Sequence, residues 1–281
     1  MKTAREHTFG DVTAIELGRG VFGRPYMTVF AYAAGGIAID SGLPHQRAVA
    51  VEFFRRQRTH AIALTHYHED HSGNAAAVSA ATGSPVFGSA GTAGWMRQRF
   101  PIQLYRQMVW GAAEPIPLQP LPDVVAGDGV KLLPIATPGH SADHTVYLEP
   151  DRGWLFSGDL YVADRIKYFR AEQRLDQEIA SLQRVLERDF DSVFCGHHPV
   201  AGGGKQRLRN KLDFLVNFSG QVRALAGRGL PPRAIARELK LRETWFVRIW
   251  TAGDVSLRNM IHAALVDSDK YHTPAAPNAT D

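Results

Sequence analysis

The sequence predicts an α/β fold followed by a helical region, and two patterns support this prediction. From the N-terminus to about residue 200, short apolar and β-branched runs alternate with glycine-containing turns and amphipathic segments. Beyond that point the strand signals stop, and apolar residues recur at helical spacing. With 281 residues, of which 44% are hydrophobic and 21% charged, the chain has the composition of an ordinary soluble globular protein with a sizeable core.

The N-terminal part predicts strands, a hairpin and one helix. Apolar runs cover Val12 to Leu17, the segment from Met27 and the segment that ends at Asp40, with a glycine pair between the last two. Residues 45–57 fit an amphipathic helix loosely, and the apolar run from Ala61 to Thr65 then predicts another strand. Strand, helix and strand therefore follow one another, and a cluster of polar residues begins where the last strand ends.

The same pattern recurs downstream. The segments VKLLPIATPGH, TVYLEP, WLFSGDL and SVFCGHH each predict an apolar strand that runs into a loop, and residues 175–190 predict a covering helix. Together with the strand at 61–65, four strand ends carry His or Asp. Because ligands and catalytic groups in layered α/β folds gather in the loops after strands, these residues are expected to converge on one site.

After residue 205 the chain predicts helices separated by Gly or Pro. We expect a catalytic domain over residues 1–205, a helical C-terminal subdomain over 206–268, and a disordered tail over 269–281. The helices could cap a substrate pocket or form a homodimer contact, and the sequence does not choose between these roles. Lys205 to Lys240 holds many cations, among them Lys211, against only Asp213 and Glu238; a solvated helix face is favoured over nucleic-acid binding.

The compartment is expected to be the cytoplasm. The first residues contain no apolar signal region, and no stretch approaches eighteen uninterrupted apolar residues, so neither export nor membrane spanning is indicated. Cys195 is the single cysteine and cannot form an internal disulfide, which is compatible with a reducing compartment. The net charge of +4 says little about partners.

The strongest chemical signal is the loop after the strand at 61–65. His66, His68, Asp70 and His71 fall within six positions there, and a loop can wrap such a cluster around cations. Imidazole nitrogen and carboxylate oxygen are ligands that Zn²⁺ accepts, and the mixture also suits Fe or Mn. Without a metal, so many groups that are costly to desolvate would be crowded together. This segment therefore predicts a metal site.

The pattern His-x-His-x-Asp-His, followed downstream by TPGH, SGD and GH, resembles the metallo-β-lactamase superfamily, and the resemblance extends over roughly residues 10 to 205. It implies a four-layer αβ/βα sandwich with two divalent metal ions at one edge between the sheets, and zinc is the expected metal. It further implies that His66, His68 and His140 hold one metal and that Asp70, His71 and His197 hold the second. Asp159 would bridge the two metals, and the early Asp40 would support the site without binding metal.

The expected activity is hydrolysis by a hydroxide that bridges two metals, since a metal lowers the pKa of its bound water to about 7. Asp70 is the candidate catalytic residue, because it could ligate and also orient or accept the nucleophile's proton. The segment 137–160 is similar to the glyoxalase-II-like and lactamase-like branches that carry a C-terminal helical domain, which implies a thioester, lactone or other ester-like small-molecule substrate.

Three alternatives stay open. Paired metals and basic helices would suit a phosphodiesterase or ribonuclease, although no nucleic-acid-binding motif is evident. An iron-dependent persulfide dioxygenase would use the first site alone, and the complete second set argues against it. A scaffold with a structural metal would need a site closed by four protein ligands, whereas this set indicates open, shared coordination.

Several further residues are weighed against ordinary roles. His197 is preferred to His198 because the family pattern takes the His directly after Gly, and His144 and Cys195 are expected to pack or support. Tyr67 is expected to be a core aromatic, with a pocket role as the alternative. The aromatic-rich and Met-rich stretch from Trp95 to Gly111 is the expected pocket wall, which favours an apolar or amphipathic substrate.

Overall fold

The computed structural model describes residues 1–20, 23–25 and 27–266. The first sheet has seven strands in the order β1-β2-β3-β4-β5-β6-β7, and its first four strands are antiparallel while β4 to β7 are parallel. The strands are β1 (Lys2–Phe9), β2 (Val12–Arg19), β3 (Val29–Ala34), β4 (Ile37–Ile39), β5 (Ala61–Ala63), β6 (Val86–Gly88) and β7 (Gln119–Pro120).

The second sheet has five strands in the order β13-β11-β10-β9-β8, with β13 parallel to β11 and the others antiparallel. These are β8 (Val125–Ala126), β9 (Lys131–Ala136), β10 (Thr145–Glu149), β11 (Trp154–Gly158) and β13 (Ser192–Cys195). A small third sheet pairs β12 (Phe169–Arg170) with β14 (Val255–Ser256). The predicted strands are therefore present.

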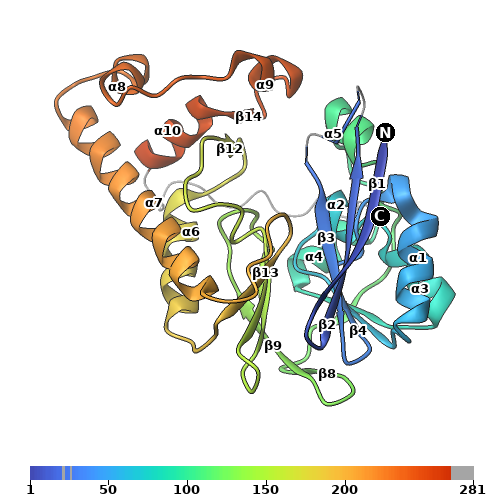
Figure 1. Cartoon of the computed structure of the whole chain (residues 1–281). Coiled ribbons are helices and arrows are strands. Elements are labelled where there is room, and N and C mark those ends of the chain that lie inside the picture. Colours follow the sequence, from blue (N-terminus) through green and yellow to red (C-terminus); the bar gives the residue numbers. More distant parts are fainter. Residues whose placement is uncertain (21–22, 26, 267–281) are drawn as a thin grey trace, which may run out of the picture.

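Helices cover the outer faces of both large sheets. On the first side lie the 3-10 helix η1 (Pro44–Gln46) and the helices α1 (Arg47–Arg56), α2 (Glu69–Ser72), α3 (Ala75–Thr82), α4 (Ala90–Met96) and α5 (Leu104–Val109). On the other side lie α6 (Leu175–Leu186), α7 (Gly204–Gly227), α8 (Pro232–Glu238), α9 (Trp245–Trp250) and α10 (Leu257–Leu265). Figure 1 shows α1 and α3 outside one sheet and α6 and α7 outside the other.

Three apolar clusters account for this layering, because each sheet buries both of its faces. One cluster joins Tyr32 and Ile37 of the first sheet to Tyr147 and Phe156 of the second, so it lies between the sheets. A second packs α1 against the first sheet, and a third packs α6, α7 and α10 against the second. The order helix, sheet, sheet, helix is the predicted four-layer αβ/βα sandwich.

The C-terminal helices share a core with the second sheet. Leu208, Leu215, Ile235 and Met260 belong to the same buried cluster as Val193 of β13. The predicted boundary between residues 205 and 206 therefore falls inside a continuous core, and a separate subdomain remains a prediction. The predicted tail over 269–281 lies outside the described residues.

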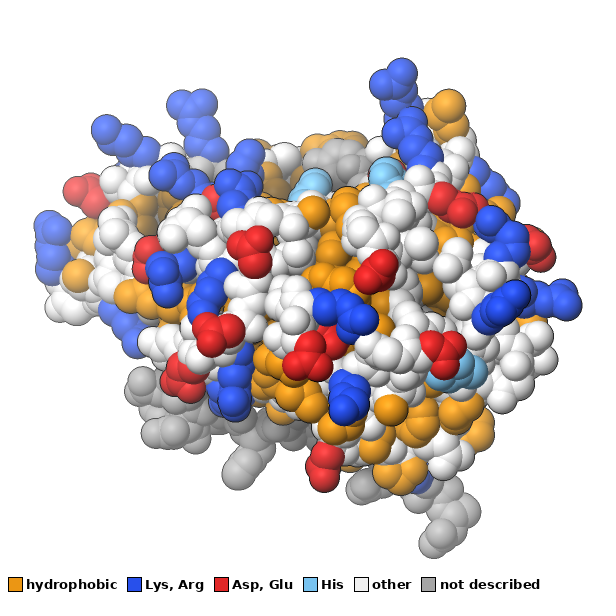
Figure 2. Space-filling model, turned by 60° about the horizontal axis from the view of Figure 1, so that its bottom comes forward, with side chains coloured by type: hydrophobic (Ala, Val, Ile, Leu, Met, Phe, Trp, Pro, Cys, Tyr) orange, Lys and Arg blue, Asp and Glu red, His pale blue; other side chains and the backbone are white. Residues whose placement is uncertain are grey.

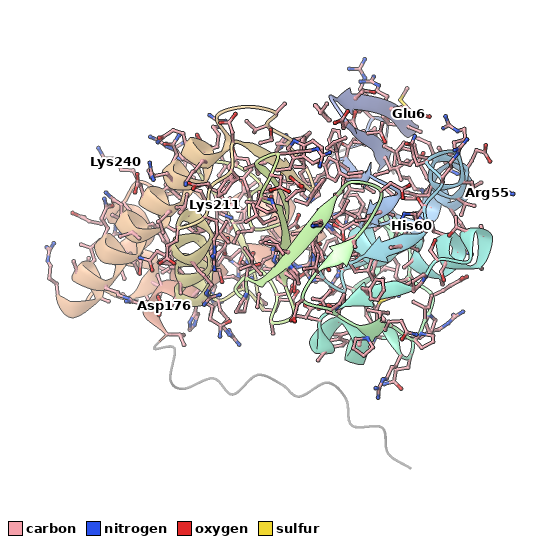
Figure 3. The ribbon with its side chains drawn as sticks, turned by 90° about the horizontal axis from the view of Figure 1, so that it is seen from below. Glu6, Arg55, His60, Asp176, Lys211 and Lys240 are labelled. Atoms are coloured by element: carbon pink, nitrogen blue, oxygen red, sulfur yellow. The ribbon has the colours of Figure 1, made fainter. Side chains whose placement is uncertain are left out.

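Two expectations were wrong. Strand signals were expected to stop after residue 205, yet β14 pairs with β12; a two-residue strand is too short to give a periodic signal. Lys211 was placed on a basic helix face, but it is 1% exposed and its Nζ lies 2.6 Å from Glu178 Oε1. Figure 3 shows Lys211 inside the molecule and Lys240 at its outer edge. The strand β1 was not predicted, because its residues are mainly polar and each is exposed or half-buried.

No helix in the described part of the chain is long and apolar enough to cross a membrane. On the face seen in Figure 2, Lys and Arg side chains are interspersed with Asp and Glu rather than gathered into one patch. That distribution is typical of a solvated surface.

Candidate metal centre

The predicted ligands meet at one edge of the sandwich, each delivered by a loop that follows a strand. His66 comes after β5, His140 after β9, Asp159 after β11 and His197 after β13. The short helix α2 turns the chain directly after His68, so that Asp70 and His71 return to the same place. All seven side chains are buried: His66, His68, Asp70, His71, His140, Asp159 and His197.

Their ligand atoms form three overlapping groups, each lying within 4.8 Å: His66 with His68 and His140, His66 with His71 and Asp159, and Asp70 with His71 and His197. The carboxylate of Asp159 lies between the first and last groups. Its Oδ1 is 3.2 Å from His71 Nε2 and 3.4 Å from His197 Nε2, and its Oδ2 is 3.4 Å from His140 Nε2. The Asp159 carboxylate is therefore close to side chains of both groups.

The donor set fits metal ions on the evidence of its unsatisfied atoms. His71 Nε2 and Asp159 Oδ1 are buried without a hydrogen-bond partner among the described residues. In the first group, His68 Nδ1 lies 2.9 Å from His66 Nε2 and 3.1 Å from His140 Nε2, so three ring nitrogens meet at one point. Buried polar atoms are normally satisfied, and a cation would satisfy all of these together.

Asp40 orders one side of the centre. Its Oδ2 accepts a hydrogen bond of 2.7 Å from His71 Nδ1 and one of 2.9 Å from the Thr65 hydroxyl. Because that hydroxyl donates to Asp40, its oxygen is free to accept from His66 Nδ1 at 3.0 Å. Both rings therefore direct Nε2 toward the centre, where it could donate its lone pair to a bound cation. Asp40 has a left-handed backbone with φ of 60°, a strained conformation of the kind that functional sites retain.

Two further imidazoles, those of His197 and His68, are held by other groups. His197 Nδ1 donates to the Thr28 carbonyl at 2.7 Å, which leaves Nε2 facing the centre. His68 uses the opposite nitrogen, because its Nε2 lies 3.0 Å from Glu172 Oε1 and its Nδ1 faces inward.

The protonation states suit ligation. Burial holds the pKa values of His66, His68 and His140 well below the usual imidazole range, so these rings are neutral and can donate a lone pair. Burial tends to lower the pKa of His71, but three surrounding carboxylates raise it well above the usual imidazole range, so a cation bound here would have to displace the proton from Nε2. The pKa of Asp159 is lowered because the nearby imidazoles outweigh the effect of its burial, and its carboxylate is therefore ionised.

Two glycines make room for the centre. A Cβ at Gly196 would lie 2.6 Å from His71 Cε1 and 2.7 Å from Asp159 Oδ1, so no side chain fits there. Gly158 has φ of 46°, and a Cβ there would lie 2.8 Å from both His144 Nε2 and Thr65 Oγ1. These are the glycines of the SGD and GH motifs.

The residues weighed as ordinary take supporting places. His144 Nε2 accepts from the Asp159 backbone N–H at 3.1 Å, and burial lowers its pKa to about 3. His198 is exposed, and its backbone N–H donates to Cys195 Sγ at 3.0 Å. Cys195 is buried, and burial raises its pKa to about 12.

Tyr67 is buried, as the core role predicts, and it also contacts the site. Its ring centroid lies 4.6 Å from that of His68, and Trp95 stacks on it at 4.6 Å with an interplanar angle of 14°. Phe100 packs against both rings. Trp95 and Phe100 are half-buried, so the stretch from Trp95 contributes an aromatic wall beside His68.

Sequence reasoning missed five residues that support the site. Glu172, Arg170 and Arg106 lie in no recognisable motif, and Glu69 occupies a variable position of the His-x-His-x-Asp-His motif. Thr28 acts through its backbone carbonyl, which any residue would supply. Glu69 is fully buried and accepts from Arg106 Nε at 2.6 Å. Only the position of Glu69 inside the ligand loop hinted at a structural role.

The fold and the clustered His and Asp ligands define a metallohydrolase of the α/β sandwich class. Residues 22–210 match the family model described as the metallo-beta-lactamase superfamily. The chain belongs to this superfamily, as the motifs predicted.

Individual similarities agree with the family. A hydroxyacylglutathione hydrolase of Rhodospirillum rubrum is 33% identical over 206 residues, which cover 72% of this chain and 70% of that protein. A beta-lactamase-like protein 2 homolog of Caenorhabditis elegans is 39% identical over 77 residues, so the match spans only 25% of that protein. A solved metallo-beta-lactamase family protein from Thermus thermophilus has a TM-score of 0.61 at 19% identity, with 90% of each chain covered. This last likeness concerns the fold.

Proposed function

We propose that this chain hydrolyses a thioester, and that its centre binds two divalent metal ions, with zinc as the expected metal. The observation that carries the proposal is the convergence of seven buried His and Asp side chains in two groups, with the Asp159 carboxylate between them. Similarity to a hydroxyacylglutathione hydrolase over 70% of that protein favours a thioester among the ester-like bonds.

His66, His68 and His140 would hold one ion, Asp70, His71 and His197 the other, and Asp159 both. Two closed sites of four unshared ligands each would need eight side chains, whereas this set has seven with Asp159 shared, so a position would stay open for water or substrate. Ions bound here would lower the pKa of a bound water to about 7 and would polarise the thioester carbonyl.

The chain's own groups would orient the reaction. Asp70 is 6% exposed, and its Oδ2 lies 3.8 Å from His71 Nε2 and 3.9 Å from His197 Nε2. The other carboxylate oxygen could then accept the proton that the attacking water loses. The wall formed by Tyr67, Trp95 and Phe100 would pack against an apolar part of the substrate and exclude water beside His68.

The test compares the purified wild-type chain with His66→Ala and His197→Ala variants. The expected result is about two zinc or manganese ions per chain, fewer in both variants, with turnover of an acylglutathione thioester lost in parallel. Arg233→Ala, an exposed substitution away from the ligands, is the control and should retain both.

The same preparation is offered a lactone, a phosphodiester and short single-stranded oligonucleotides. Hydrolysis of a phosphodiester without thioester turnover would contradict the proposal and favour a nuclease. About one iron per chain, lost only in His66→Ala, would favour the persulfide dioxygenase. A wild-type chain without bound metal would overturn the mechanism.

A further inference from the structure

Glu172 stands immediately beside the first group of ligands, although no motif marks it. It follows β12 by two residues. Its Oε1 lies 3.0 Å from His68 Nε2, and its Oε2 accepts a hydrogen bond of 2.9 Å from the Tyr67 hydroxyl. One carboxylate therefore contacts two consecutive residues of the ligand loop.

The contact decides which nitrogen of His68 is protonated. An ionised carboxylate only accepts hydrogen bonds, so Nε2 must carry the proton that it donates to Glu172. The lone pair is then on Nδ1, which is the nitrogen that faces His66 Nε2 and His140 Nε2. Without this acceptor the ring could protonate at Nδ1 or turn, and either change would remove a ligand from the first group.

Glu172 is in turn held from the C-terminal part of the chain. The strand β12 pairs with β14, with Phe169 opposite Ser256 and Arg170 opposite Val255. Arg170 is shared between two carboxylates, because its Nε lies 3.4 Å from Glu172 Oε1 and its Nη2 donates to Asp254 Oδ2 at 3.4 Å. In Figure 1, β12 and β14 lie side by side next to α10, above the strands of the second sheet.

A further contact joins the Asp254 carboxylate to α5, a helix on the side of the first sheet. Asp254 Oδ2 also accepts a hydrogen bond of 2.5 Å from the Tyr105 hydroxyl on α5. Asn259 Nδ2 donates to the Phe169 carbonyl at 3.3 Å and to the Asp254 carbonyl at 2.7 Å. The segment 254–259 therefore fixes the backbone of β12 as well as the Arg170 side chain.

We propose that Glu172 is a positioning residue that sets the tautomer and orientation of His68, and that the C-terminal segment around Asp254 holds Glu172 in place. The inference rests on the proposed function in that His68 is taken as a metal ligand. It gives the helical C-terminal region a role at the centre, in addition to covering the second sheet.

The first experiment measures Zn²⁺ affinity by competition with a chromophoric chelator, with no substrate present. Glu172→Ala is expected to weaken binding by about 10–100-fold, the loss typical of removing a ligand's outer hydrogen-bond partner. Glu172→Gln should recover most of the affinity, because an amide oxygen can still accept from His68 Nε2 while the amide N–H₂ donates to Tyr67. Glu187→Ala, which removes an exposed carboxylate at the end of α6, is the control and should change the affinity little.

The second measurement is the ¹⁵N spectrum of the His68 ring in the metal-free protein. Nε2 should be the protonated nitrogen in wild type and in Glu172→Gln, and this preference should be lost in Glu172→Ala. A merely structural role would alter the thermal midpoint without changing the tautomer. Unchanged affinity together with an unchanged tautomer in Glu172→Ala would overturn the proposal.

The C-terminal part of the inference has its own variants. Asp254→Ala should weaken Zn²⁺ binding by less than Glu172→Ala does, whereas Asp213→Ala, which removes an exposed carboxylate of α7, should not weaken it. Equal affinities for Asp254→Ala and wild type would remove the C-terminal segment from the proposal. Because no turnover is measured, a chain that binds zinc through His68 but cleaves no thioester would contradict the proposed function and leave this inference standing.

Discussion

The buried pair of Lys211 and Glu178 offers a sharp test of what joins the C-terminal helices to the second sheet. Each side chain is 1% exposed, and Lys211 Nζ donates to Glu178 Oε1 at 2.6 Å and to the Leu160 carbonyl at 2.6 Å. Lys211→Met would leave the Glu178 carboxylate buried without its cation, and its Oε2 already has no hydrogen-bond partner among the described residues. Breaking a buried pair from one side costs about 3–5 kcal/mol.

That loss corresponds to a fall in the thermal midpoint of about 6–10 °C, at about 2 °C per kcal/mol for a chain of this size. In the double variant Lys211→Met with Glu178→Leu, the charge is gone and only the Leu160 carbonyl lacks its donor. The double variant should therefore recover to within about 1–3 kcal/mol of wild type.

Urea unfolding of metal-free protein, followed by circular dichroism, measures both variants against Lys240→Met. Lys240 is exposed, so its replacement should change the free energy of unfolding by less than about 0.5 kcal/mol. A Lys211→Met variant within about 1 kcal/mol of wild type, or a double variant less stable than the single, would refute the reasoning.

Three further predictions concern the centre and its surroundings. Gly196→Ala should weaken Zn²⁺ binding at least about tenfold in a chelator competition, because its Cβ would lie 2.6 Å from His71 Cε1, whereas Gly220→Ala, whose Cβ meets nothing within 4 Å, should not. Cys195 should resist alkylation in the native protein at pH 8 and react after unfolding, since burial raises its pKa to about 12; rapid native labelling would contradict this. Burial lowers the pKa of His144 to about 3, so its contribution to stability is complete above about pH 6.5 and is lost as the pH falls toward 3. In that window, His144→Gln should reduce the slope of the unfolding free energy against pH by up to about 1.4 kcal/mol per pH unit. An unchanged slope would count against this prediction.

The sequence predicted the strands that deliver ligands because their apolar residues and their polar ends lie close together in the chain. His66, His140, Asp159 and His197 each follow a short apolar run, and such runs end at one edge of a sheet whatever the distance between them. The strand β14 and the contact between Glu172 and His68 could not be predicted in this way. They depend on contacts between residues 85 or more positions apart in the chain, which periodicity within a window does not encode.

The misplacement of Lys211 has the same cause. Its spacing along the helix is equally compatible with a solvated face and with a face turned toward α6, and only the apolar residues around it distinguish the two. Leu208, Leu212 and Leu215 lie on the side that packs into the core, and Lys211 occupies that side, where Glu178 of α6 compensates its charge. A charge at a core position of a helix is informative only when its partner is known.

The position of this pair also bears on the function of the helical region. Lys211 donates to the carbonyl of Leu160, the residue directly after Asp159, while the segment around Asp254 reaches Glu172 through Arg170. Two separate contacts thus run from the C-terminal region to two different residues of the centre, one beside Asp159 and one beside His68. A region that only covered the second sheet would need neither contact, since the apolar cluster of α6, α7 and α10 already provides that cover. The helices therefore contribute to the geometry of the ligands as well as to the stability of the fold.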